Sequence, residues 1–221
     1  MSTRATGLLG LAAFGLIVGG GLIQPLWLFP GTDSSGREIA AYIGEHRTGS
    51  IASVFVFGLG MAGFLAFSAA LWAWVRRRPG VPDPLAAIFV LAAASLCTVV
   101  FAGFAVFLAL AYRAPSVTAA RELYDVTFGL LAISGLPTAL ALGAYAAIVL
   151  KARPLPVWSA WVAVIGAGAH VLIAASFFFE TGFLSLEGGV IVAIPVTMFL
   201  WLLAASVCVF TAPAEPRPAA P

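Results

Sequence analysis

Six long apolar runs alternate with short polar stretches along almost the whole chain. Each run has at least 23 residues, and a helix rising 1.5 Å per residue then crosses a hydrocarbon core of about 30 Å. The pattern predicts an all-α polytopic integral membrane protein, a six-helix transmembrane bundle forming one domain over residues 1–211. The expected spans lie at approximately residues 7–29, 50–75, 84–112, 123–150, 157–179 and 189–211.

The first run follows Arg4 and has to be distinguished from a secretory signal peptide. It is longer than the roughly 7–15 apolar residues of a signal peptide, and no clear small-residue cleavage site follows it. We therefore expect it to be retained as the first transmembrane helix.

The polar stretch between the first two runs contains its own helix signal. Ser35 and Glu38 have the spacing of a capping box, which predicts a short helix from Gly36 to Arg47 at the outer surface. Glu38, Tyr42 and Glu45 share one face of it, as in an amphipathic interfacial helix. The alternative is a lid that brings Glu45, and His46 and Arg47 after it, over a cavity opening outward. Further along the chain, Thr118 is a candidate cap for a helix leading into the fourth run.

Composition and charge place this bundle in a membrane and orient it. Of the 221 residues, 62% are hydrophobic and 9% are charged, against roughly 25% charged in soluble domains. The connections on the side of both termini carry seven basic and two acidic residues, and those on the other side carry four basic and seven acidic residues. Because basic residues favour the cytoplasmic side, we expect a multi-pass plasma-membrane protein with both termini in the cytoplasm. The proline-rich residues 212–221 are expected to be a disordered tail.

Several function classes lack their sequence signals. The basic cluster at residues 76–78 ends an apolar run, as topology anchors do, so we expect the lipid bilayer and no nucleic acid as a partner. Cys97 and Cys208 fall at different depths, which argues against a disulfide. His46 and His170 are too few and too far apart for a typical zinc or haem site, and no P-loop is present. The sequence predicts no cofactor and no metal, and it leaves the oligomeric state open. Ten arginines against one lysine, with many Ala and Gly residues, suggest a high-GC bacterial source.

One candidate site lies at the outer end of the fourth run. Arg121 and Asp125 are four residues apart and share a helix face, with Tyr124 beside them. A carboxylate that enters the hydrocarbon is costly unless it is paired, hydrated or protonated. Asp125 is therefore either a general acid, with Arg121 and Tyr124 contacting substrate, or an acid at a helix start that Arg121 neutralises.

A second candidate site lies on the fifth run. His170, Phe177 and Glu180 fall within an arc of about 80° on a helix and so have the placement to line one cavity. An intramembrane histidine is a candidate functional residue, and Glu180 is a second candidate acid. The alternative for His170 is a neutral imidazole bonded to a carbonyl or a serine of a neighbouring helix. Phe177 is a candidate substrate contact, as is Glu45.

Small residues and prolines inside the runs predict how the helices pack. Gly15 and Gly19, Ala139 and Gly143, and Gly166 with Gly168 have the spacing that allows close helix approach. Pro137 and Pro195 each remove a backbone hydrogen bond inside a run, and the resulting kinks often widen a central cavity.

These features support three hypotheses about function. The first is a small acid-catalysed enzyme, cyclase- or isomerase-like, acting on a lipophilic isoprenoid-like molecule in an outward-opening cavity, with Asp125, Glu180 and His170 as catalytic residues. The second is a proton-coupled transporter using His170 and Asp125. The third is a non-catalytic accessory subunit whose polar outer helix is a docking surface.

Overall fold

Six membrane-length helical spans form the protein, as predicted. The computed structural model describes residues 2–25, 28–31, 33–113, 116–179, 182–186 and 189–213, and within these ranges it contains helices and no strand. Long apolar helices need lipid around them, so the chain is a multi-pass integral membrane protein. The spans are α1 (Thr3–Ile23), α3 (Arg47–Val75), α4 (Asp83–Arg113), α5 (Val117–Ile133) with α6 (Gly135–Ala152), α7 (Val157–Ala174) with η2 (Ala175–Phe178), and α8 (Val190–Thr211).

The first span begins and ends earlier than its apolar run. Ser2 caps α1, its hydroxyl accepting a hydrogen bond from the Ala5 amide at 3.2 Å. The helix ends at Ile23 because Pro25 disfavours helical backbone at the residue before it. Phe29, expected at the end of the span, therefore lies in the connection that follows α1.

The fourth span is interrupted at Ser134, between α5 and α6. Pro137 has no amide hydrogen, so the regular helical hydrogen bond to the Ile133 carbonyl cannot form. Beside this point, the Ser134 hydroxyl donates to the Leu131 carbonyl at 2.6 Å. At the start of this span, Ser116 is the cap rather than Thr118, and its hydroxyl accepts from the Ala119 amide.

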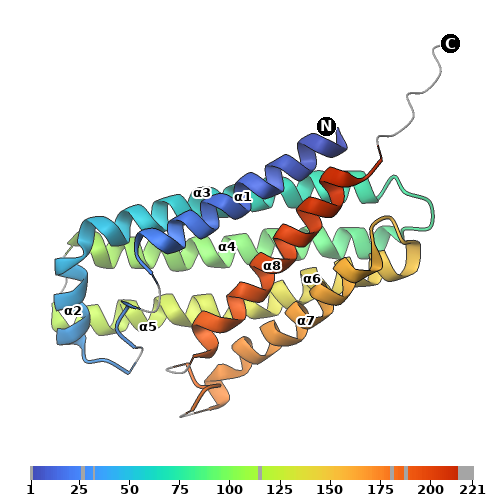
Figure 1. Ribbon diagram of the computed structural model, residues 1–221. Helices are drawn as coiled ribbons and strands as arrows, with labels where there is room; N and C mark the ends of the chain where they lie inside the picture. The colour runs from blue at the N-terminus through green and yellow to red at the C-terminus, as the bar shows by residue number, and fades with distance from the viewer. Residues whose placement is uncertain are drawn as a thin grey trace.

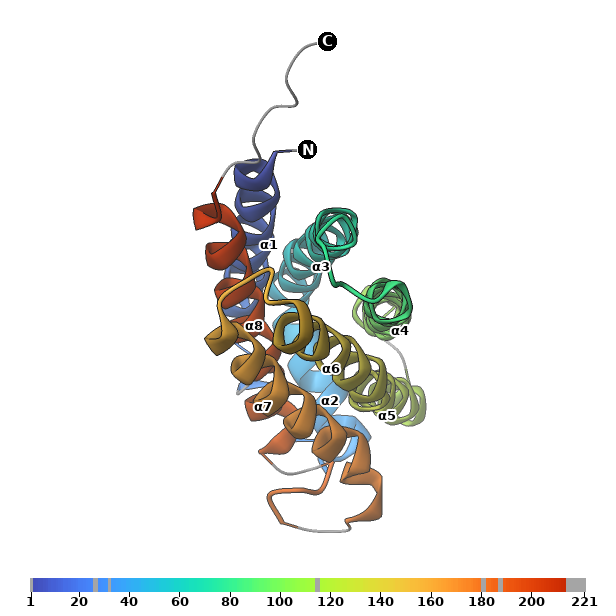
Figure 2. The same cartoon turned by 90° about the vertical axis from the view of Figure 1, so that its right-hand side faces the viewer.

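The spans form a ring in chain order. Each packs against the one before it, and α8 returns to pack against α1. Figure 1 shows α3 and α4 running side by side while α8 crosses them obliquely, and Figure 2 views the bundle from the end where both termini lie. We call this the terminus end and the opposite one the α2 end, after helix α2 (Gly36–Glu45).

Close approach between α1 and its neighbours depends on glycines other than those expected. A Cβ atom on Gly20 would lie 2.5 Å from the Phe57 backbone nitrogen of α3, and one on Gly7 would lie 2.6 Å from the Phe210 Cα atom of α8. By contrast, no described atom lies within 4 Å of such a Cβ on Gly15 or Gly19. The prediction for these two, and likewise for Gly143 and Gly168, was wrong, while Gly166 packs closely against Leu142.

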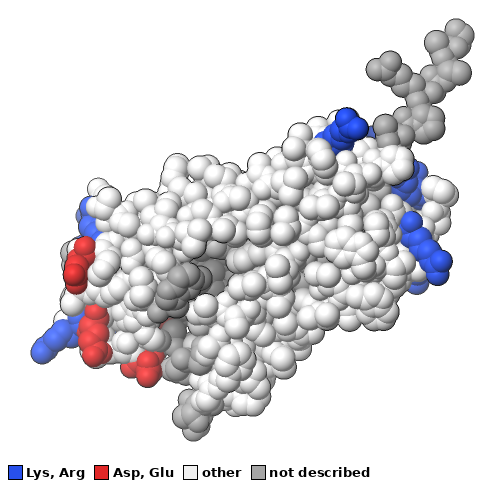
Figure 3. Space-filling view, viewed as in Figure 1, with Lys and Arg blue, Asp and Glu red and all other residues white. Residues whose placement is uncertain are grey.

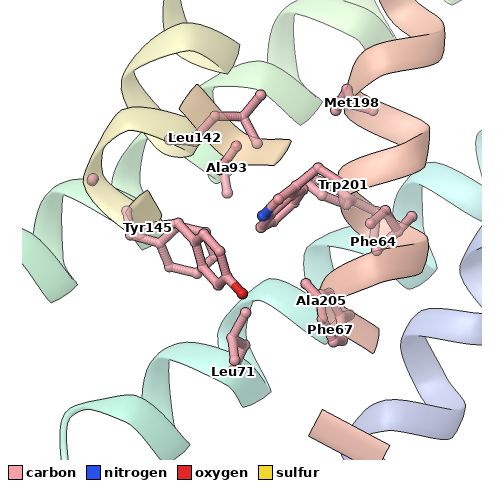
Figure 4. Close-up of a cluster of buried hydrophobic side chains, with 14 of the residues drawn as sticks. Phe64, Phe67, Leu71, Ala93, Leu142, Tyr145, Met198, Trp201 and Ala205 are labelled. Carbon is pink, nitrogen blue, oxygen red and sulfur yellow. The ribbon is translucent and has the colours of Figure 1, made fainter. Parts of the chain in front are cut away.

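Aromatic side chains fill the ring near the terminus end. The Trp201 ring meets the Tyr145 ring edge to face at 5.1 Å between centroids, with Phe64 and Phe89 beside it. In Figure 4 the Trp201 indole nitrogen points toward the Tyr145 ring, which gives a buried N–H group a π-face as its neighbour. The Tyr145 hydroxyl meets the Ser159 hydroxyl at 2.9 Å. These aromatic side chains belong to the main cluster of buried hydrophobic residues in the bundle.

Helix α2 closes the other end. Its capping box is present as predicted: the Ser35 hydroxyl accepts from the Glu38 amide, and the Glu38 carboxylate accepts from the Ser35 amide at 2.8 Å. These hydrogen bonds to the carboxylate lower the pKa of Glu38. Ile39 and Ile43 are buried against the ends of α4 and α5, so α2 packs onto the bundle through its apolar face.

The charges gather at the two ends (Figure 3). The terminus end carries lysine and arginine, whereas acidic and basic side chains mix at the α2 end. The described surface between them in this view is uncharged, as a lipid-facing belt requires.

Candidate functional site

A cavity of about 490 Å³ occupies the interior of the ring in the half nearer the α2 end. All six spans contribute to its wall: Ile17 and Leu22 from α1, Phe57 from α3, Val100 and Phe104 from α4, Phe128 from α5, Thr138 from α6, His170 from α7, and Pro195 and Phe199 from α8. Its size is within the range of roughly 300–1,000 Å³ that small-molecule pockets have.

Among the described lining residues, the side chains are apolar apart from four hydroxyls and one imidazole. Each hydroxyl donates its proton to a backbone carbonyl at 2.6–2.9 Å: Ser53 to Gly20, Thr127 to Leu123, Ser134 to Leu131, and Thr138 to Ser134. Such bonds satisfy the hydroxyl proton and leave oxygen lone pairs. Among the lining residues the structure describes, none carries a charged side chain.

His170 is the titratable side chain in this wall. Its Nδ1 atom lies 2.8 Å from the Gly166 carbonyl, one turn earlier on α7, and 3.5 Å from the Thr197 hydroxyl oxygen of α8. The Thr197 hydroxyl donates to the Ile194 carbonyl, so a carbonyl and an oxygen lone pair face Nδ1. This nitrogen therefore carries the proton of the neutral ring, and Nε2 has only its lone pair.

The alternative weighed for His170 was a neutral imidazole bonded to a backbone carbonyl or to a serine of a neighbouring helix. Its close partner is a backbone carbonyl of its own helix, while the neighbouring helix supplies a more distant threonine rather than a serine. Within the described ranges, Nε2 has no hydrogen-bond partner, and the buried His170 side chain is one of the cavity-lining residues. It is a free acceptor at the cavity wall.

The cavity reaches the surface of the bundle between α1 and α8. Val18, Leu22 and Val196 all line it, yet their exposed fractions are 37%, 63% and 48%. Figure 1 shows α1 and α8 close together at the terminus end and diverging toward the α2 end. Because both helices belong to the membrane-spanning set, this opening faces the lipid phase.

The connection after α1 closes the cavity toward the α2 end. Phe29, Pro30 and Gly31 line it. The Tyr124 hydroxyl donates to the Pro30 carbonyl at 2.6 Å, and the Phe29 ring packs on the Phe107 ring at 5.6 Å between centroids. Tyr124, a predicted substrate contact, is fully buried and lies behind this connection rather than among the lining residues.

Asp125 and Arg121 also lie outside the cavity wall. The Arg121 Nε atom donates to the Asp125 carboxylate at 2.9 Å, and an Nη1 hydrogen bond of 2.6 Å goes to the Ser34 carbonyl. The pair sits at the α2 end with both side chains partly exposed. This geometry matches the ion pair weighed as the alternative to a general acid.

Among the remaining predicted site residues, Phe177 and Glu45 do not line the cavity with His170. Helix α7 gives way to η2 at Ala175, so Phe177 leaves the face that continuous helical geometry predicted, and its side chain is 53% exposed. Glu45 is exposed at the end of α2. Glu180 lies outside the described residues.

Sequence reasoning missed the hydroxyls of Ser53, Thr127, Ser134 and Thr138 as part of the site. The prolines were the available signal: Pro195 lines the cavity, and Pro137 lies between Ser134 and Thr138. No group of three His, Cys, Asp or Glu side chains with a metal-binding arrangement occurs in the described part of the chain.

Comparisons of the chain with protein-family models, with curated proteins and with solved structures each find no match. The case for a function therefore rests on the geometry of the cavity.

Proposed function

We propose that this membrane protein binds a lipid-soluble small molecule in the cavity and takes it from the bilayer through the opening between α1 and α8. The observation that carries the proposal is an apolar cavity of about 490 Å³ that lies within the spans and reaches their surface between two helices. An apolar molecule dissolved in lipid meets this opening without passing through water.

The character of the wall supports an apolar ligand. Phe57, Phe104, Phe128 and Phe199 surround the space with aromatic faces, and Leu, Ile, Val and Met side chains supply the rest of the apolar surface. Pockets of this kind bind through buried apolar area and orient the ligand with few polar groups. His170 and the four hydroxyls are those groups here.

The packing of side chains near the terminus end argues against transport of a polar solute. The aromatic cluster around Trp201 and Tyr145 occupies the interior between the cavity and the terminus end. In the described residues the wall also lacks the charged or strongly polar stripe that a hydrophilic solute requires. Storage, sensing or conversion of a lipophile fits this shape better.

If the bound molecule is converted, His170 is the residue placed to exchange a proton with it. Asp125 is engaged with Arg121 away from the wall, so the proposal does not use it as the acid. A neutral imidazole with a free Nε2 atom can accept a proton from a ligand, as a general base does.

Photolabelling in lipid nanodiscs tests the proposal. The probe is a farnesol analogue that carries a diazirine on its chain, and its adducts are mapped by mass spectrometry of peptides. We expect adducts on cavity-lining segments of α4 and α8. Val100→Trp, which places an indole in the cavity, should reduce this labelling by about tenfold, equivalent to about 1.4 kcal/mol of binding free energy.

The matched control is Leu91→Trp, which adds the same side chain to the lipid-facing side of α4. It should leave labelling of the cavity segments unchanged. Adducts confined to lipid-facing residues, or equal labelling of the wild type and Val100→Trp, would refute binding in the cavity.

A further inference from the structure

We infer that the ligand is an uncharged lipophile whose head group donates a hydrogen bond, an alcohol or phenol, and that the Nε2 atom of His170 accepts this bond. The inference rests on the proposed function and specifies the substrate class of the same cavity. It follows from the charges and hydrogen bonds of the described side chains that line the cavity.

Charge is the first criterion. No Asp, Glu, Lys or Arg side chain is among the cavity-lining residues that the structure describes. An ionised carboxylate, phosphate or ammonium head group would therefore be buried without a counter-charge, at a cost of several kcal/mol. This criterion excludes fatty acids, isoprenoid diphosphates and lipid amines in their charged forms.

Hydrogen-bond polarity is the second criterion. The four hydroxyl protons of the wall and the Nδ1 proton of His170 are all directed at backbone carbonyls. The described side chains of the wall thus offer lone pairs and no free proton. A ketone, ester or ether, which only accepts hydrogen bonds, gains no side-chain donor here, whereas a hydroxyl finds an acceptor.

The location of the acceptors is the third criterion. Gly135 packs so closely against α7 that a Cβ atom on it would lie 2.4 Å from the His170 carbonyl oxygen. Gly135 directly follows Ser134, and Thr138 lies one helical turn beyond Ser134. The break between α5 and α6 therefore lies where the chain packs against the α7 segment that carries His170, and the Ser134, Thr138 and His170 residues all line the cavity. This cluster is one polar spot in an apolar wall.

The neutral state of His170 completes the argument. An imidazolium would need both ring nitrogens to meet acceptors, and Nε2 faces an apolar space without a carboxylate among the described lining residues. The neutral ring with its proton on Nδ1 is then the stable form, and its Nε2 lone pair is the strongest neutral acceptor of the wall.

Competition against the farnesol photoprobe tests the inference. The competitors are farnesol, its methyl ether, which keeps the chain and the oxygen but has no proton to donate, and farnesoic acid at neutral pH. In the wild type we expect the ether to compete about three- to tenfold more weakly than farnesol, which is the net value of one hydrogen bond. The carboxylate should compete most weakly.

Variants of His170 assign the preference to its Nε2 atom. His170→Phe keeps a ring but removes the acceptor, so farnesol and its ether should compete equally. His170→Gln supplies an amide oxygen and should restore part of the preference. His46→Phe, at the histidine outside the cavity wall, should preserve the wild-type ratio.

The outcomes separate the inference from the proposed function. If the photoprobe labels the cavity but alcohol and ether compete equally in the wild type, the head-group inference is wrong and the binding function stands. An alcohol preference that survives His170→Phe likewise overturns the role of His170. Absence of cavity labelling by the photoprobe overturns both.

Discussion

Arg121 connects two segments that are far apart in the sequence. Its guanidinium donates to the Asp125 carboxylate on its own helix and to the Ser34 carbonyl at the start of α2. The first contact is a partly exposed i, i+4 ion pair, a kind that contributes little to stability. The second is a charge-assisted hydrogen bond that holds the connection before α2 onto α5. The loop contact should therefore be the more valuable one.

Arg121→Gln should lower the free energy of unfolding by about 1–2 kcal/mol, because it removes both contacts. Asp125→Asn should cost less than about 1 kcal/mol, because it weakens only the ion pair and leaves the contact with Ser34 in place. Thermal unfolding of the purified protein in mild detergent measures both, with Arg37→Gln on the exposed side of α2 as the control. Equal destabilisation by the first two variants would contradict the importance of the loop contact.

His170 illustrates how far the sequence predicts a site at this scale. A histidine within an apolar run is visible in the sequence, and its neutral, carbonyl-bonded state was one of two interpretations. The sequence does not specify which carbonyl bonds to His170. The identity of this carbonyl determines which ring nitrogen remains available to a ligand. Because Nδ1 bonds to Gly166 on the same helix, Nε2 remains free for the cavity. Which side chains of neighbouring helices meet depends on how each helix is rotated about its own axis. The sequence of a single apolar run does not specify this rotation.

Among the helices, α1 shows most clearly that one face packs against neighbouring helices and another does not. Gly20 lies against the backbone of Phe57 on α3, whereas no described atom lies within 4 Å of the position that a Cβ would take on the adjacent Gly19. The sequence motif Gly15 and Gly19 has the expected spacing, but it lies on the wrong side of the helix. Four-residue spacing identifies one face and cannot tell whether that face meets protein or lipid.

Gly20→Ala should therefore destabilise the protein by about 1–3 kcal/mol, because the added methyl group meets backbone atoms that cannot rotate away. Gly19→Ala adds the same group one residue earlier and should be neutral or slightly stabilising, since alanine favours the helix. Thermal unfolding of the two variants side by side gives the comparison. A smaller loss of stability for Gly20→Ala than for Gly19→Ala would mean that α1 packs through another face.

Element boundaries were the least predictable part of the fold. The number of spans follows from hydropathy, and the capping box of α2 follows from two residues at a fixed spacing. The end of α1 before Pro25 and the break at Ser134 lie inside apolar sequence, where hydropathy does not change. Proline chemistry sets both, and these two irregular segments supply cavity-lining residues, among them Phe29 and Ser134. The site was hard to predict because it is built where regular helix stops.

At the scale of the molecule, the charges predict an orientation. Among the described residues, the terminus end carries six basic side chains and one acidic side chain, and the α2 end carries four basic and five acidic ones. The excess of basic residues predicts that the terminus end lies in the cytoplasm. The opening between α1 and α8 would then lie in the outer half of the bilayer, and α2 would lie on the external surface.

Single cysteines at the two ends test this orientation in cells. Gly44→Cys, exposed on α2, should react with a membrane-impermeant maleimide added to intact cells, and Arg77→Cys should react only after the membrane is opened. Cys97 and Cys208 are buried, so the background from native thiols should be low. The reverse pattern of labelling would invert the topology.

The contact of α8 with α1 joins the last span to the first. Every other extensive contact between spans joins neighbours in the sequence, so those contacts can form as each helix leaves the translocon. Closure between α1 and α8 must await the final helix, because about 170 residues separate the end of α1 from the start of α8. A nascent chain that stops before Val190 already holds His170 and the four hydroxyls but has no sixth wall around them. Under the proposed function, biogenesis would confer ligand binding only at its final step, and the seam closed at that step would be the one through which the ligand enters.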